Sequence, residues 1–113
     1  MRILIALSPD GLLRRFEAVG HAGAAVRGHN VACAAVTTLL RTTGRLCVER
    51  GITLAGGAGG AGEPGEMRLI LSAGAAPEGG WLRGVTDFLL RGVKDLQEEF
   101  PKEIALRLEM TEV

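Results

Sequence analysis

The alternation of hydrophobic and polar residues divides the chain into short strands and two longer helical segments. Residues 2–7 form a near-continuous apolar run that ends at Ser8-Pro9-Asp10-Gly11, a pattern that predicts a buried strand followed by a turn. In residues 13–20 and 104–111 apolar side chains alternate with polar ones, as expected for strands with one face in water. The first two strands should therefore form a hairpin.

Two further short strands are predicted on either side of a glycine-rich stretch, at residues 52–55 and 67–72. The intervening residues 56–65 contain mostly Gly and Ala, so we expect a flexible and poorly ordered connection. This stretch formally matches G-x-G-x-x-G. However, Pro64-Gly65 follows it instead of a helix that would hold a pyrophosphate, so no dinucleotide cofactor is expected.

Two segments have the periodicity of helices. The segment from Val31 to about Arg50 lacks Pro and is apolar nearly all round in its first turns, which predicts a buried helix, and Gly51 is expected to end it in a left-handed cap. From Trp81 to Phe100, apolar residues that include Phe88 recur every three or four positions, which predicts an amphipathic helix with this face on the sheet.

This order of elements predicts an α+β fold. We expect a two-layer sandwich in which both helices cover one face of a mixed sheet of about five strands, in the order ββαββαβ. Residues 1–113 are predicted to form a single domain, because a chain of this length can bury a core without disulfides or metals.

Composition and charge narrow the possible partners. Thirteen basic and thirteen acidic residues give a formal net charge of zero, so neither nucleic acid nor an anionic membrane is an expected partner. No apolar run approaches the roughly 20 residues of a membrane span, and the N-terminus has no signal-peptide pattern, which predicts a cytoplasmic protein. Cys33 and Cys47, roughly 21 Å apart if they share one helix, should both be free thiols.

The candidate chemistry is concentrated between Gly20 and Thr37. Asn30 is a good helix N-cap, which places Cys33 in the first helical turn, among backbone N–H groups that have no intrahelical acceptor. These groups and the helix dipole favour a nucleophilic thiolate. His21 lies upstream across a segment of small residues and is a candidate base.

Simpler interpretations of these residues stay open. Cys33 in its Ala/Val-rich run also suits a small buried side chain, and Cys47 is most simply core filling. His29 competes with His21 as the base, although its position before the cap favours a solvated ring. His29 and Cys33 form the only plausible ligand pair, so no metal site is expected. The acidic run within residues 95–103 is typical of the solvent-exposed side of a helix end, and it would also attract a basic protein substrate.

The segment resembles the signature of the ribosomal-processing cysteine protease (Prp) family. The matching residues are Gly20-His21-Ala22-Gly23, then Gly28, then Cys33-Ala34-Ala35-Val36-Thr37. The resemblance implies that His21 and Cys33 are the catalytic pair. Substrate binding or orientation is then expected from the neighbouring residues Gly20, Ala22, Gly23, Gly28, Asn30, Ala34 and Thr37.

The resemblance also implies a comparable fold, a homodimer and a ribosomal protein substrate, with no cofactor. The expected reaction removes an N-terminal extension from a large-subunit ribosomal protein, after a short apolar motif. The chain departs from the family pattern at Asn30, where an acidic residue is usual, and at residues 24–26, where the family carries an aromatic and an acidic residue. These departures bear on substrate preference and on how the histidine is oriented.

Two other classes of function remain as alternatives: a non-catalytic ribosome-assembly or binding protein of the same fold, and a thiol-based sensor. For a protease, we expect residues 22–28 to be open and mobile without substrate, with His21 and Cys33 out of hydrogen-bond contact.

Overall fold

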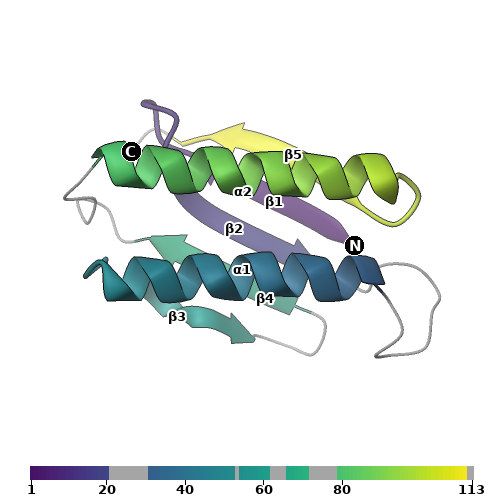
Figure 1. Cartoon of the computed structure of the whole chain (residues 1–113), viewed down its shortest axis with the longest axis horizontal. Coiled ribbons are helices and arrows are strands. Elements are labelled where there is room, and N and C mark those ends of the chain that lie inside the picture. The colour runs from purple at the N-terminus through teal and green to yellow at the C-terminus, as the bar shows by residue number, and fades with distance from the viewer. Residues whose placement is uncertain (21–30, 53, 62–65, 72–78, 112–113) are drawn as a thin grey trace.

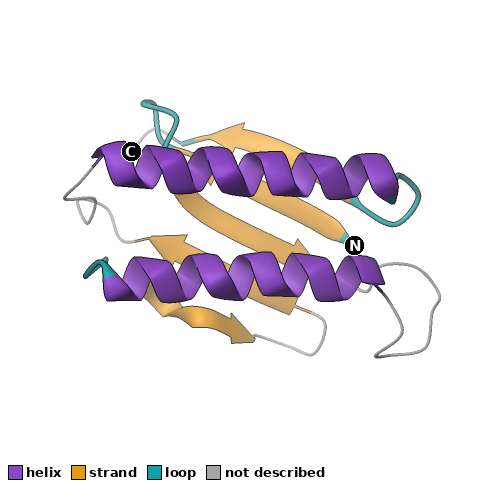
Figure 2. Ribbon diagram, viewed as in Figure 1, coloured by secondary structure: helices purple, strands orange, loops and turns teal. Residues whose placement is uncertain are grey.

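Seven elements follow one another along the chain in the computed structural model, which describes residues 1–20, 31–52, 54–61, 66–71 and 79–111. Two helices lie on one face of a sheet, so the fold is a two-layer α+β sandwich (Figures 1 and 2). The α+β class and the mixed sheet with two helices are confirmed. The elements are β1 (Arg2–Leu7), β2 (Leu13–Val19), α1 (Val31–Glu49), β3 (Leu54–Ala61), β4 (Glu66–Leu71), α2 (Gly79–Glu99) and β5 (Ala105–Met110).

The sheet has the strand order β3-β4-β2-β1-β5. Strands β1 and β2 form the predicted antiparallel hairpin, and β4 and β3 extend the sheet antiparallel beyond β2. Strand β5 pairs parallel to β1 at the other edge. Strand β1 lies between two strands, and Ile3 and Ile5 on one face and Ala6 on the other are almost fully buried, which agrees with the near-continuous apolar run in this segment.

The helices run in opposite directions across the sheet (Figure 1). Helix α1 packs over β3 and β4, whereas α2 packs over β2 and β5. A Cβ atom added to Gly92 of α2 would lie 3.1 Å from Cδ1 of Leu39 on α1, so glycine permits the close approach of the two helices here. The core between the layers is built mainly from fully buried apolar side chains, among them Leu13, Phe16, Val36, Leu40, Leu69, Leu89 and Val93.

The end of α1 has the predicted glycine cap. Gly51 has a φ of 80°, and its N–H donates to the carbonyl of Val48 at 3.0 Å. The N–H of Ile52 donates to the carbonyl of Cys47 at 2.9 Å, which completes a Schellman motif. The helix therefore ends where the sequence indicates, and Ile52 is returned to the core.

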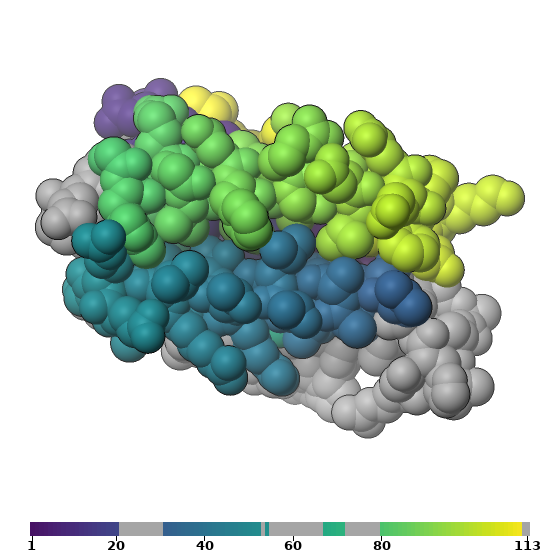
Figure 3. Space-filling model, in the orientation of Figure 1, coloured from purple at the N-terminus to yellow at the C-terminus, as the bar shows by residue number. Residues whose placement is uncertain are grey.

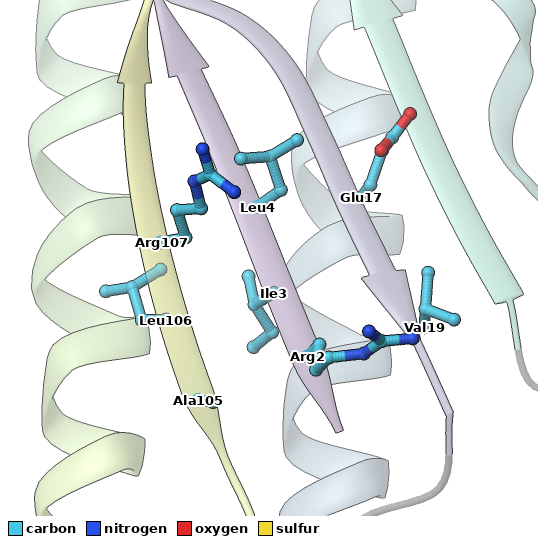
Figure 4. A pocket seen from close by; sticks show the side chains of 8 residues that line it. All are labelled: Arg2, Ile3, Leu4, Glu17, Val19, Ala105, Leu106 and Arg107. Atoms are coloured by element: carbon cyan, nitrogen blue, oxygen red, sulfur yellow. The ribbon is translucent and has the colours of Figure 1, made fainter.

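The other face of the sheet carries charged side chains and is not covered by either helix. Oε1 of Glu17 lies 3.4 Å from Nε of Arg15 and 3.7 Å from Nε of Arg68. Nη2 of Arg107 lies 3.2 Å from Oε1 of Glu109. A shallow hollow of about 290 Å³ surrounds Leu4 on this face, and Figure 4 shows the apolar and charged side chains that line it. Such ion pairs are worth little to stability in water, but they keep the uncovered face compatible with solvent.

Strand β3 is longer than the sequence predicted. It continues through the glycine-rich stretch to Ala61, with Gly60 opposite Arg68 and Ala61 opposite Met67 after a register shift that follows Ala55. The expectation of a flexible connection is therefore wrong for residues 56–61, while residues 62–65 lie outside the described residues. At Gly60 and Ala61 the physical reason is that β4 offers backbone donors and acceptors, and pairing with them outweighs the weak strand propensity of glycine. Residues 56–59 form a bulge opposite Leu69.

Strand β5 also differs from its prediction. Leu106 is half-buried, but Leu108 and Met110 are 46% and 63% exposed, so the expected buried face is incomplete. The strand lies at an edge of the sheet, where it has β1 on one side only, and alternation along the sequence does not reveal that position.

One described helix meets the length and composition of a membrane span, contrary to the expectation that none would. The helix is α1, with a mean hydropathy of 1.2 over its most apolar window, a third of which is buried inside the protein. Core helices of globular proteins meet the same criterion, and Ala32, Val36 and Leu40 of α1 are buried in the core shared with the sheet.

We predict that Thr86→Val lowers the free energy of unfolding by about 1–3 kcal/mol. Thr86 is almost fully buried in α2, and its Oγ1 accepts the N–H of Leu13 at 2.9 Å while donating to the carbonyl of Leu82. Valine would leave the buried Leu13 N–H without an acceptor. The matched control is Thr38→Val, where the hydroxyl donates to the preceding turn on an exposed helix face. Urea unfolding should show little change for the control, and equal losses for both variants would contradict this role of Thr86.

Candidate active site

Cys33 occupies the position in α1 that the sequence predicted. The helix begins at Val31, so Cys33 is its third residue and lies in the first turn. The side chain is partly buried against the core, and it forms no disulfide. The first-turn N–H groups have no acceptor within the helix, so the thiol is set among backbone donors.

The thiol lies on the side of α1 that faces away from α2. At about 100° per residue, Cys33 shares its line along the helix with Leu40 and Gly44, which are both buried. Leu39, which meets Gly92 of α2, lies about 120° round the helix from Cys33. Since α1 packs over β3 and β4, Cys33 is placed above this half of the sheet. Figure 1 shows that α1 begins at the end of the sheet where β2 ends and β4 begins.

Cys47 has the environment of an inert thiol. Its exposure is zero, and burial raises the pKa of the thiol above its ordinary value of 9.0. A thiol that is buried and protonated at neutral pH is neither accessible nor nucleophilic. The two cysteines are thus distinguished by position: one in the core, the other at the border of the core in the first turn of α1.

Three other residues predicted for the site are also placed by the structure. Gly20 follows β2, is exposed and has a φ of 88°, a conformation that favours glycine. Thr37 is half-buried one turn beyond Cys33, on the same side of α1. Ala34 is exposed, and its carbonyl accepts the Thr38 hydroxyl at 2.9 Å. Gly20 at the end of β2 and these residues of α1 belong to segments that lie at the same end of the molecule (Figure 1).

The remaining predicted site residues lie outside the described residues. These are His21, Ala22, Gly23, Gly28 and Asn30, together with the competing base His29. The pairing of His21 with Cys33 and the open state of residues 22–28 stay predictions. Among the described residues, no group of three His, Cys, Asp or Glu side chains is arranged to hold a metal ion.

A groove between the helices was not predicted from the sequence. It has a volume of about 630 Å³ and lies between the second half of α1 and the first half of α2, on the outer face that Figure 3 shows. Phe88, which the periodicity placed on the sheet, lines this groove and is 69% exposed. The two helix positions Phe88 and Leu89 differ by about 100°, and only Leu89 faces the core. The groove is lined by Thr38, Leu39, Thr42, Thr43, Leu46, Gly80, Trp81, Gly84, Val85 and Phe88.

Comparison with protein families identifies the class of protein. The family model described as cysteine protease Prp matches residues 1–105. The chain therefore belongs to the Prp family, it is a cysteine protease, and the resemblance seen in the sequence is confirmed. A search of curated protein sequences finds no match.

Solved structures share the fold at low sequence identity. The essential ribosomal processing protease Prp from S. aureus, in complex with a covalently linked product peptide, has a TM-score of 0.75 at 16% identity, covering 97% of this chain and 98% of that one. The same S. aureus protease with a substrate peptide has a TM-score of 0.74 at 14% identity, with 96% and 98% coverage. SMU.848 from Streptococcus mutans has a TM-score of 0.75 at 23% identity, with 97% and 94% coverage. These likenesses show that the fold is shared over nearly the whole chain.

We predict that iodoacetamide labels Cys33 much faster than Cys47 in the folded protein near neutral pH. Cys33 is partly exposed among backbone donors, whereas Cys47 is buried and held as a neutral thiol. Mass spectrometry of tryptic peptides over a time course measures both rates, and labelling in denaturant is the control. Equal rates in the folded protein would contradict the distinction between the two thiols.

Proposed function

We propose that the protein is an endopeptidase in which Cys33 is the nucleophile and His21 the acid and base. Membership of a cysteine protease family requires an accessible thiol, and the chain has two cysteines. The observation that carries the assignment is the difference in position between the two cysteines. Cys47 is fully buried in the core, whereas Cys33 lies in the first turn of α1. Residues 1–113 would act as one domain.

The proposed reaction follows the chemistry of a thiolate at a helix start. The Cys33 thiolate attacks the carbonyl carbon of the scissile peptide bond, and the resulting oxyanion accepts hydrogen bonds from backbone N–H groups of the first turn, including that of Cys33. His21 donates a proton to the leaving amine as the C–N bond breaks, which leaves a thioester on Cys33. A water molecule, deprotonated by His21, then hydrolyses the thioester and restores the thiol.

The residues around this pair would hold the substrate backbone. Small residues at Gly20, Ala22, Gly23 and Gly28 permit a close approach of the peptide, and Ala34 and Thr37 lie beside Cys33 on α1. Asn30 would cap the helix and orient the histidine, as Asn does in papain-like enzymes. An acidic residue would stabilise an imidazolium more strongly, so a slower reaction is expected here than in relatives that carry one.

The proposed substrate is an N-terminal extension of a large-subunit ribosomal protein. Support comes from the S. aureus relative, a ribosomal processing protease solved with substrate and product peptides. Its fold covers nearly all of this chain, so an equivalent peptide substrate is consistent with the shape of the molecule. Such a substrate would place the reaction in the cytoplasm, where ribosomal proteins are assembled.

We predict that Cys33→Ser and His21→Ala each reduce cleavage of a peptide spanning the host protein's extension by at least about 1000-fold, because each removes half of the reacting pair. Liquid chromatography of the products measures the rates, and circular dichroism checks the fold. Cys47→Ala is the matched thiol control. It should retain turnover while losing stability through a core cavity, and His29→Ala should change turnover little. Retained cleavage by Cys33→Ser would remove this proposal.

We also propose that the protein forms a homodimer through its helix layer. The exposed side chain of Phe88 protrudes beside a groove on the same face, and added Cβ atoms at Gly80 and Gly84 would meet nothing within 4 Å. A protrusion and a hollow on one face suit a two-fold interface, in which the same surface patch meets itself. The exposed side chain of Leu46 extends the apolar area across α1.

Phe88→Glu should therefore shift the protein from dimer to monomer, since a carboxylate placed in an apolar interface has no partner. Light scattering after size-exclusion chromatography measures the mass. Asp87→Asn, at the neighbouring exposed position, is the matched control and should leave the dimer intact. A wild-type protein that is monomeric at high micromolar concentration would overturn this interface.

A further inference from the structure

We infer that the peptide substrate binds as an additional strand along the free edge of β3, which delivers the scissile bond to Cys33. The inference rests on the proposed function, because it specifies how that site recognises its substrate. It concerns the described residues Leu54–Ala61 and the position of α1 above them.

The first observation is the open edge itself. Strand β3 is the last strand of the sheet and, in the described part of the chain, pairs with β4 only. Backbone N–H and C=O groups on its other side are thus available to a further strand. Peptides commonly bind proteins in this way, with main-chain hydrogen bonds supplying affinity for an extended segment.

The second observation is that this edge carries no charged side chain and no proline. Exposed edges in natural proteins are commonly blocked by charged side chains or proline, and β3 reads LAGGAGGA, with neither. Its pairing with β4 is interrupted by a bulge, in which residues 56–59 lie opposite Leu69, and it resumes at Gly60 and Ala61. The paired ends of β3 on either side of this bulge are therefore the part of the edge that a further strand would use.

The third observation connects the edge to the nucleophile. Helix α1 packs over β3 and β4, and Cys33 lies on the side of α1 turned away from α2. Figure 1 shows β3 running toward the end of the molecule at which α1 begins. A strand added to β3 would therefore run toward the first turn of α1, where the oxyanion would be bound.

The opposite edge of the sheet does not offer the same geometry. Strand β5 lies four strand positions away from β3, roughly 19 Å at about 4.8 Å per strand, and it packs beneath α2. It also carries the charged residues Arg107 and Glu109. Of the two edges, β3 is the one that is both uncharged and adjacent to the helix that bears Cys33.

The test is a backbone N-methyl scan of a synthetic peptide that spans the host ribosomal protein's extension. In an added strand every second N–H points at the neighbouring strand, so methylation at alternate positions should lower kcat/KM roughly 2- to 10-fold and leave the intervening positions nearly unchanged. A loss confined to the scissile bond, or one without alternation, would overturn the inference.

A matched pair of enzyme variants tests whether the peptide binds along the edge of β3. Gly60→Pro and Ala61→Pro each remove one N–H from β3, and neighbouring residues direct theirs to opposite sides of the strand. One variant should lower kcat/KM at unchanged stability, and the other should mainly lower the free energy of unfolding by breaking the ladder to β4. Identical kcat/KM values for the two variants would overturn the inference.

Failure of this inference is distinguishable from failure of the proposed function. Cleavage of the unmethylated peptide and acylation of Cys33 report on the function alone. Hydrogen exchange of the β3 amides in Cys33→Ala, measured with and without the same peptide, reports on the edge even if no cleavage occurs. Slower exchange is expected on binding, and unchanged exchange at saturating peptide would contradict strand addition.

Discussion

Burial of α1 against the sheet is the constraint on which the rest of the structure depends. Val36 and Leu40 are fully buried in the core, and together they fix the rotation of the helix about its axis. If the helix were rotated about its axis by one residue position, every side chain would move by about 100°. Leu40 would then be exposed, and Cys33 would move away from the β3–β4 side. The reactive position is therefore set by hydrophobic packing some turns away from the chemistry.

Helix α2 supplies the other half of this constraint. The close approach at Gly92 and Leu39 holds the two helices together, and the buried hydroxyl of Thr86 ties α2 to the start of β2. Cys33 thus lies on a rigid layer, while the groove and Phe88 lie on the outer face of the same layer. The proposed catalytic and dimer surfaces share their supporting helices but use different sides of α1.

Local signals predicted much of this arrangement. Near-continuous apolarity identified β1, and the Asn30 position and Gly51 located both ends of α1. These features depend on residues that are close together in the sequence, which is why the sequence alone predicts them. The assignment of Cys33 to the first turn of α1 follows from the same local signals.

The features that were missed depend on partners distant in sequence. Ala61 joins the sheet because β4 lies beside it, and Met110 is exposed because β5 is at an edge. Phe88 fits an apolar helical repeat, yet it points about 100° away from Leu89 round α2, and only Leu89 is buried in the core. The groove likewise exists only once two helices are packed, so no single segment could indicate it.

The central claim is that Cys33, at the start of α1, is the residue acylated by substrate. The most direct measurement is rapid acid quenching of the wild-type protein during its first turnover of the extension peptide, followed by intact-mass analysis and peptide mapping. Our account predicts a thioester between the N-terminal product and the tryptic peptide that contains Cys33. A thioester on Cys47, or burst-free turnover in which no acyl-enzyme is trapped and Cys33→Ser remains active, would contradict it.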